Sequence, residues 1–175
     1  IENASLWGLD ANGNVSQPSA TAYAYRSHSG FYGIVNSEDA YQNLIRFLFG
    51  DRRVDIWVDV ADINLPADVQ AQADTGKDVD ALYQFEVLVA PRRAPWYLTR
   101  RTPEEDSVAC LTHKEFLKSK AAGDAVKKVY LSTAFLGNKR LIDRPELSRS
   151  YTVTLAVRTP DYEVDRSFWL DSHYE

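Results

Sequence analysis

The sequence contains no methionine, and its first residue is isoleucine. We therefore expect the chain to be a processed product or a piece of a longer protein. Its single cysteine, Cys110, excludes an intramolecular disulfide framework. An excess of basic residues is also missing, because 20 Lys and Arg stand against 25 Asp and Glu, a net charge of −5. Nucleic-acid-binding domains carry a basic surface, so we expect no nucleic-acid partner.

Long apolar runs are absent as well. No stretch approaches the roughly 18 apolar residues of a transmembrane helix, so no membrane-spanning segment is predicted. The start IENASLWG lacks the basic and apolar regions of a signal peptide, and the sequence does not indicate a cellular location. What is present is a globular composition, with 45% hydrophobic and 26% charged residues. A chain of 175 residues can bury roughly 70% of its unfolded surface in one domain or one and a half.

The first fifty residues predict a hairpin, a loop and a helix. Segments 1–9 and 21–26 are short and extended, with turn residues between them. Residues 27–33 are rich in serine and glycine and form a loop. Ser37 suits the N-cap and Gly50 the C-cap of a helix over residues 37–49. One face of this helix carries an apolar stripe, formed by Tyr41, Leu44, Ile45 and Leu48.

Apolar and polar residues alternate in the chain after Gly50, which predicts antiparallel strands with one buried face each. The inward-facing rows are Val54, Ile56, Val58 and Val60; Tyr83, Phe85, Val87 and Val89; Val129, Leu131, Thr133 and Phe135; and Tyr151, Val153, Leu155 and Val157. Further strands are predicted at 96–101 and 168–170, a polar loop at 64–78 and a short helix at 112–120. About six such strands favour a mainly β fold, an antiparallel β-sandwich of C2-like or Greek-key type, because two apolar faces then cover each other.

Three histidines are the candidates for acid–base catalysis. His113 lies at the start of the short helix and His173 near the end of the chain, and we predict that both are exposed and inert. His28 lies in the serine- and glycine-rich loop, after an extended segment and before the amphipathic helix. A histidine on such a loop can reach sideways to a nucleophile on another strand.

The stretch RSHSGFYGIVNSEDAYQNL, residues 26–44, resembles the C-terminal end of bacterial lipase/esterase-type serine hydrolases with the α/β-hydrolase fold. The resemblance covers about residues 1–51, and its specific part runs from Arg26 to Asp51. It implies that His28 is the general base of a catalytic triad. It also implies that residues 1–51 end a catalytic domain, and that 52–175 form an accessory β-sandwich domain.

Two parts of that catalytic machinery are missing from the chain. No Gly-x-Ser-x-Gly nucleophile elbow occurs, and the triad acid of this family precedes the histidine, which places it upstream of Ile1. Asp10 precedes His28 but lies in a turn sequence, and Ser27 and Ser29 adjoin the histidine too closely to be activated by it. We therefore predict no catalysis by the chain alone. The expected partner is the remainder of the catalytic domain or a second copy of the chain, with a lipid or ester as substrate.

A second hypothesis comes from another class of protein. The whole chain would then be a non-catalytic β-sandwich module that binds a lipid or protein surface. The acidic residues Asp59, Asp62, Asp161 and Asp165 leave open a calcium-dependent lipid site. Otherwise the sequence contains no motif for a metal or cofactor, and we predict none.

Overall fold

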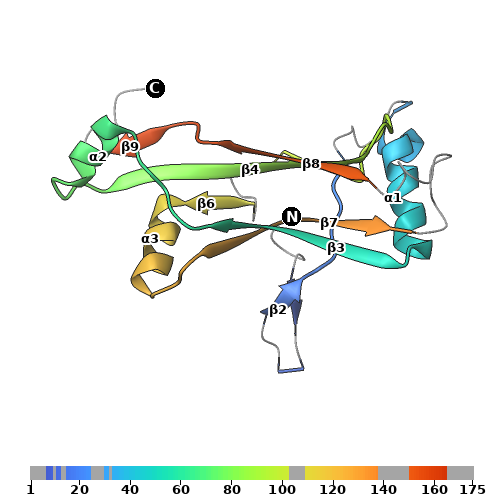
Figure 1. The fold of residues 1–175 in the computed structure, drawn as a ribbon, viewed down its shortest axis with the longest axis horizontal. Coiled ribbons are helices and arrows are strands. Elements are labelled where there is room, and N and C mark those ends of the chain that lie inside the picture. Colours follow the sequence, from blue (N-terminus) through green and yellow to red (C-terminus); the bar gives the residue numbers. More distant parts are fainter. Residues whose placement is uncertain are drawn as a thin grey trace.

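The computed structural model of the protein describes residues 7–9, 11–12, 15–24, 30–31, 33–102, 109–137 and 150–164 (Figure 1). Several sites named from the sequence lie outside these residues: Asp10, His28, Asp165, His173 and the strand expected at 168–170. In chain order the elements are β1 (Trp7–Leu9), β2 (Val15–Pro18), the 3-10 helix η1 (Ile34–Asn36), α1 (Glu38–Phe49), β3 (Arg52–Val60), α2 (Ala67–Ala73), β4 (Val79–Pro91), β5 (Thr99–Arg101), β6 (Cys110–Thr112), α3 (His113–Ala121), β7 (Lys127–Leu136), β8 (Tyr151–Arg158) and β9 (Tyr162–Val164).

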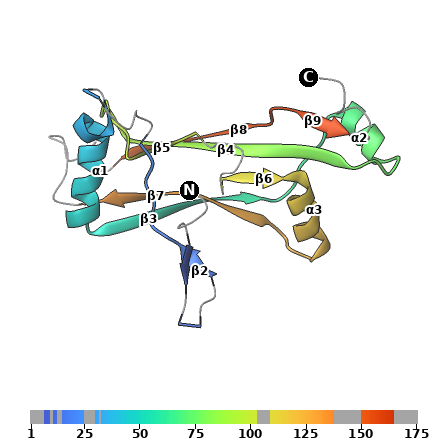
Figure 2. The ribbon, with the colours of Figure 1, turned by 180° about the vertical axis from the view of Figure 1, so that it is seen from behind.

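The fold is mainly β, and two antiparallel sheets face each other as a β-sandwich (Figures 1 and 2). The larger sheet is built around β4, which pairs with β5 and β6 and with β8 and β9. The smaller sheet consists of β3 and β7. Alternate residues of β4 point into the core. The predicted row of Tyr83, Phe85, Val87 and Val89 is buried, and Val79 and Ala81 extend it.

Both helices predicted from the sequence are confirmed, together with the caps predicted for the first, Ser37 and Gly50. The Ser37 hydroxyl accepts a hydrogen bond from the backbone N–H of Ala40 (3.2 Å) at the start of α1. Thr112 caps α3 in a capping box, in which the Glu115 carboxylate accepts from the Thr112 backbone N–H. These ends are local features, which explains why local sequence identifies them.

The row predicted on β7 is wrong beyond Leu131. Ile56 pairs with Ser132 and its neighbour Trp57 pairs with Tyr130, so β7 carries an extra residue in a β-bulge. The extra residue reverses the alternation. Val129 and Leu131 belong to the core, but the next core residue is Ala134, whereas Thr133 bonds to Asp55 and the Phe135 ring packs against Phe47.

Three other expectations are corrected. The polar stretch 64–78 contains the helix α2, which begins after Pro66 and buries Val69. The strand expected at 96–101 is shortened to Thr99–Arg101. The hairpin is formed by β1 with β2, and residues 21–24 are not one of its strands.

The inner row of β8 is the fourth correction. Tyr151, Val153, Leu155 and Val157 are 45–55% exposed, although their pairing with β4 places them on the core side. β7 packs against β4 and β5. The two-stranded sheet is therefore too narrow to cover the far edge of the larger sheet.

Candidate functional site

His28 lies outside the described residues, but the described residues before and after it contact the sandwich. Before the loop, the backbone carbonyl of Thr21 accepts from the Thr133 N–H of β7, and that of Tyr23 accepts from the Arg100 N–H of β5, both at 2.8 Å. After the loop, η1 leads directly into α1. Residues 19–24 thus bridge both sheets and close one side of the sandwich.

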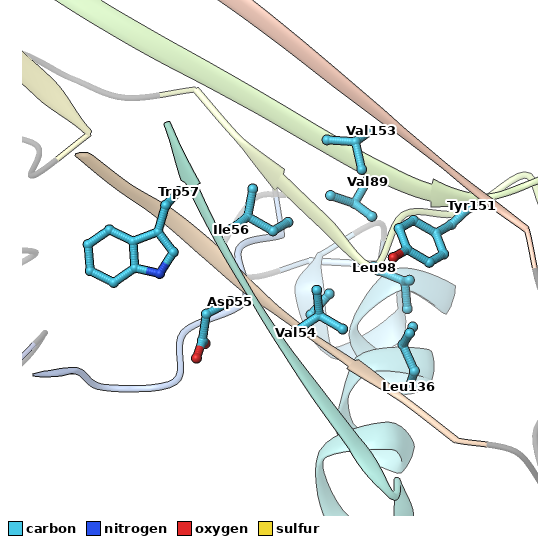
Figure 3. A pocket seen from close by; sticks show the side chains of 10 residues that line it. Val54, Asp55, Ile56, Trp57, Val89, Leu98, Leu136, Tyr151 and Val153 are labelled. Carbon is cyan, nitrogen blue, oxygen red and sulfur yellow. The ribbon is translucent and has the colours of Figure 1, made fainter. Parts of the chain in front are cut away.

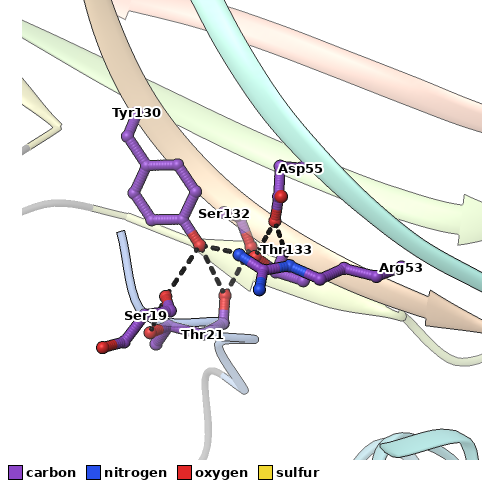
Figure 4. Close-up of polar contacts among 7 residues, drawn as sticks. All are labelled: Ser19, Thr21, Arg53, Asp55, Tyr130, Ser132 and Thr133. Carbon is purple, nitrogen blue, oxygen red and sulfur yellow. Dashed lines mark hydrogen bonds and ion pairs between the residues drawn. The ribbon is translucent and has the colours of Figure 1, made fainter. Parts of the chain in front are cut away.

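Side chains on β7 and β3 reinforce this closed side (Figure 4). The Thr133 hydroxyl donates to the carboxylate of Asp55 (2.6 Å), which also pairs with Arg53 (2.9 Å). The Ser132 hydroxyl donates to the Thr21 carbonyl (3.3 Å), and the Tyr130 hydroxyl lies 2.7 Å from that of Thr133. Since every hydroxyl of this cluster is engaged in positioning the chain, we assign the cluster a structural role.

Helix α1 is attached to the sandwich through a stripe of polar side chains, in addition to the contact of Phe47 with Phe135. Asp39 and Arg46 are 6% exposed, and with Asn43 they form a stripe at positions i, i+4 and i+7. The Asp39 carboxylate accepts from the Tyr97 N–H (2.6 Å), and the Asn43 amide donates to the Tyr97 carbonyl (3.2 Å). The Arg46 guanidinium lies 4.7 Å above the centre of the Trp96 ring, a cation–π contact.

The apolar stripe of the same helix is only partly covered. Ile45 is of intermediate exposure, whereas Tyr41, Leu44 and Leu48 are 54–55% exposed. An ordinary surface helix turns its apolar side to the core and its polar side to water. In α1 the polar Asp39 and Arg46 are buried while Tyr41, Leu44 and Leu48 are half exposed, so this part of its apolar face is available to another structure.

An apolar groove of about 230 Å³ enters the opposite, open side of the sandwich (Figure 3). Among the described residues β3 pairs only with β7 and β8 only with β4, so both strands present free edges there. The groove is lined by Val54, Asp55, Ile56, Trp57, Val89, Leu98, Ala134, Leu136, Tyr151 and Val153. Asp55 and Trp57 point away from the space that Val54 and Ile56 face. The sequence does not indicate this groove, because its mouth exists only where the two sheets differ in width.

The expectation that His113 is exposed is wrong. Its ring is 5% exposed, and Nδ1 lies 3.0 Å from the Tyr83 hydroxyl. Burial lowers the pKa of His113. Burial, together with the neighbouring Tyr162, raises the pKa of Tyr83 to about 12. The first turn of α3 lies against β4, which explains why His113, its first residue, turns inward. Both directions of shift favour the neutral forms of His113 and Tyr83 at pH 7.

The described residues contain no group of three His, Cys, Asp or Glu side chains close enough to hold a metal ion. In that part of the chain, none of the helices combines the length and apolarity needed to cross a membrane. Comparison with protein-family models, with curated proteins and with solved structures finds no match.

Proposed function

We propose that the chain is the C-terminal portion of a lipase/esterase-like serine hydrolase, in which residues 52–175 form an accessory β-sandwich. In this arrangement α1 is shared. Its polar stripe binds the sandwich, and its apolar stripe packs against the sheet of the catalytic domain. The observation that carries the proposal is the half-exposed apolar stripe of α1.

The free energy that burial of this stripe would provide supports the proposal that a further part of the protein covers it. Burying a large apolar side chain is worth roughly 1.5–3 kcal/mol, and Tyr41, Leu44 and Leu48 are half exposed. A helix of 12 residues is marginal on its own, so packing has to stabilise it. In α/β folds the helices cover the two faces of the central sheet with such stripes. The His-loop resemblance makes α1 the last of these helices.

In this proposal His28 takes the proton of a serine hydroxyl that the catalytic domain supplies, and later returns it to the leaving alcohol. The backbone hydrogen bonds of Thr21 and Tyr23 to β7 and β5, and the polar stripe of α1, position the described residues on either side of His28. The sandwich would therefore help to orient His28, in addition to any role in binding.

The experiment uses the complete polypeptide that contains this sequence in the organism, which we call the source polypeptide. Hydrolysis of p-nitrophenyl esters and labelling by a fluorophosphonate are measured for the unaltered protein and for His28→Ala. We expect the variant to lose hydrolysis by at least about a thousandfold, because loss of a triad member removes most of the catalysis. The control is His113→Gln, which alters the buried histidine that contacts Tyr83 and should leave turnover unchanged. Equal activity of His28→Ala and the unaltered protein would refute the proposal.

The second candidate function is a non-catalytic binding module, and the apolar groove between β3 and β8 favours it. Under this alternative the source polypeptide hydrolyses no ester and is not labelled by fluorophosphonate. The same two measurements therefore separate the candidates.

A further inference from the structure

We propose that the groove between β3 and β8 binds the aliphatic chain of a medium-length fatty acid. This site goes beyond the hydrolase proposal and does not depend on it. The groove lies within the sandwich, and its occupancy can be measured without any turnover.

The size of the groove suits such a chain. Its volume is about 230 Å³. An engineered protein cavity of about 150 Å³ lined by aliphatic and aromatic side chains stays free of water and binds benzene, which has six carbons. In proportion, the groove accommodates about nine carbons of a straight chain.

The interior of the groove favours a hydrocarbon over a peptide. Its deepest residues are core side chains, and Val89 and Leu98 are 1% exposed. The backbone hydrogen-bonding groups of a sheet lie in the plane of the sheet, so the facing surfaces of two sheets offer side chains alone. A peptide inserted between them would bury N–H and C=O groups without partners, which is costly, whereas a methylene chain has none to satisfy.

The lining of the groove has features that would receive the head of the acid. Tyr151, on β8, contributes a hydroxyl that can donate to a carboxylate, and Figure 3 shows this hydroxyl turned toward Leu98. The Asp55 carboxylate, which would repel an anion, points away from the interior and is held by Thr133 and Arg53. The half-exposed row of β8 extends the apolar surface beyond the mouth. The side of the sandwich opposite the groove is closed by residues 19–24. The aliphatic chain of the acid therefore enters from the side of β3 and β8.

Isothermal titration calorimetry with saturated fatty acids of six to twelve carbons, below their micelle concentrations, tests the site. We expect the affinity to rise about fourfold per added carbon, which corresponds to about 0.8 kcal/mol per buried methylene. The increase should stop near nine or ten carbons. Val153→Trp, which fills the groove from a half-exposed position, should weaken binding at least tenfold. Thr154→Trp places the same ring on the other face of β8 and should leave binding unchanged.

Val153→Glu places a carboxylate beside the aliphatic chain of the acid, and this second variant should abolish binding. Thermal melting confirms that each variant is folded. An affinity independent of chain length would overturn the proposal, as would equal effects of the two tryptophan variants. Binding of an alternating Val-Thr peptide in preference to the acids would show instead that β3 or β8 accepts a strand. Binding to phosphatidylcholine vesicles without binding of the free acids would show a membrane surface.

Discussion

Gly50 joins α1 to β3, and its replacement by alanine distinguishes two opposite expectations. Its φ of −75° is open to any residue. On backbone grounds alone, Gly→Ala at such a position stabilises a protein by about 0.4–1 kcal/mol, because the unfolded chain loses freedom. However, a Cβ at this position would lie 2.3 Å from the Arg46 carbonyl oxygen and 2.7 Å from that of Leu136.

Both obstructing atoms belong to the backbone, so neither can rotate away. The Gly50 N–H donates to the Arg46 carbonyl (2.8 Å) and the Asp51 N–H donates to the Leu136 carbonyl (3.0 Å). Relieving the clash means shifting the end of α1 away from β7 and weakening these bonds. Overpacking of this kind costs about 1–3 kcal/mol. We therefore expect Gly50→Ala to lower the free energy of unfolding by about 2 kcal/mol, or the Tm by about 4–8 °C.

Urea denaturation followed by circular dichroism measures this change. Gly123→Ala is the matched control. Its φ is +90° and its Cβ would meet nothing within 4 Å, so it reports backbone strain without a clash. Phe49→Ala, next to Gly50 but 67% exposed, should cost little. Unchanged or increased stability of Gly50→Ala would refute the close packing of α1 against the end of β7.

Three further predictions concern the core, the catalytic machinery and the boundary between the two parts. Because burial lowers the pKa of His113, the unfolded state binds the proton first as the pH falls below about 6.5. Stability present above that pH is then lost, by up to about 1.4 kcal/mol per pH unit. His113→Gln should flatten the urea-midpoint difference between pH 7.5 and 5.5, and an unaltered difference would contradict the burial of the ring. The isolated 175-residue chain should hydrolyse neither short nor long acyl esters, and turnover that disappears with His28→Ala would show that it contains a complete site. A fragment of residues 52–175 should unfold cooperatively, because β3 to β9 supply both faces of the core, although it should be less stable without the hydrogen bonds of residues 19–24. A fragment without a cooperative transition would make α1 part of the sandwich.

Sequence patterns predicted those parts of the fold that depend on neighbours in the chain. The alternating row of β4 is fully buried, and the rows of β3 follow the predicted alternation. The predicted cap at Ser37 belongs to the same class, because the capping side chain lies three residues from the N–H that it binds. The Thr112 capping box is equally local, although we did not predict it. The period of the apolar residues and the capping residues are sufficient to predict such elements.

Features that depend on partners far along the chain were not predictable. The bulge in β7 became visible only from its pairing with β3, and it moved Thr133 and Phe135 off the core side. Asp39, Asn43 and Arg46 carry a polar signal at helical spacing, but their partners Trp96 and Tyr97 lie about fifty residues away. The groove arises from the unequal widths of two sheets, which no single segment encodes.

We propose that the apolar stripe of α1 faces a catalytic domain, and a footprinting measurement tests this most directly. Hydroxyl-radical footprinting can compare Tyr41, Leu44 and Leu48 in the source polypeptide with the same residues in the isolated chain, with the exposed Leu117 of α3 as an internal reference. We predict that Tyr41, Leu44 and Leu48 are modified in the isolated chain and protected in the source polypeptide. Leu117 should react equally in both. Equal modification of the stripe in the two proteins would contradict the shared helix.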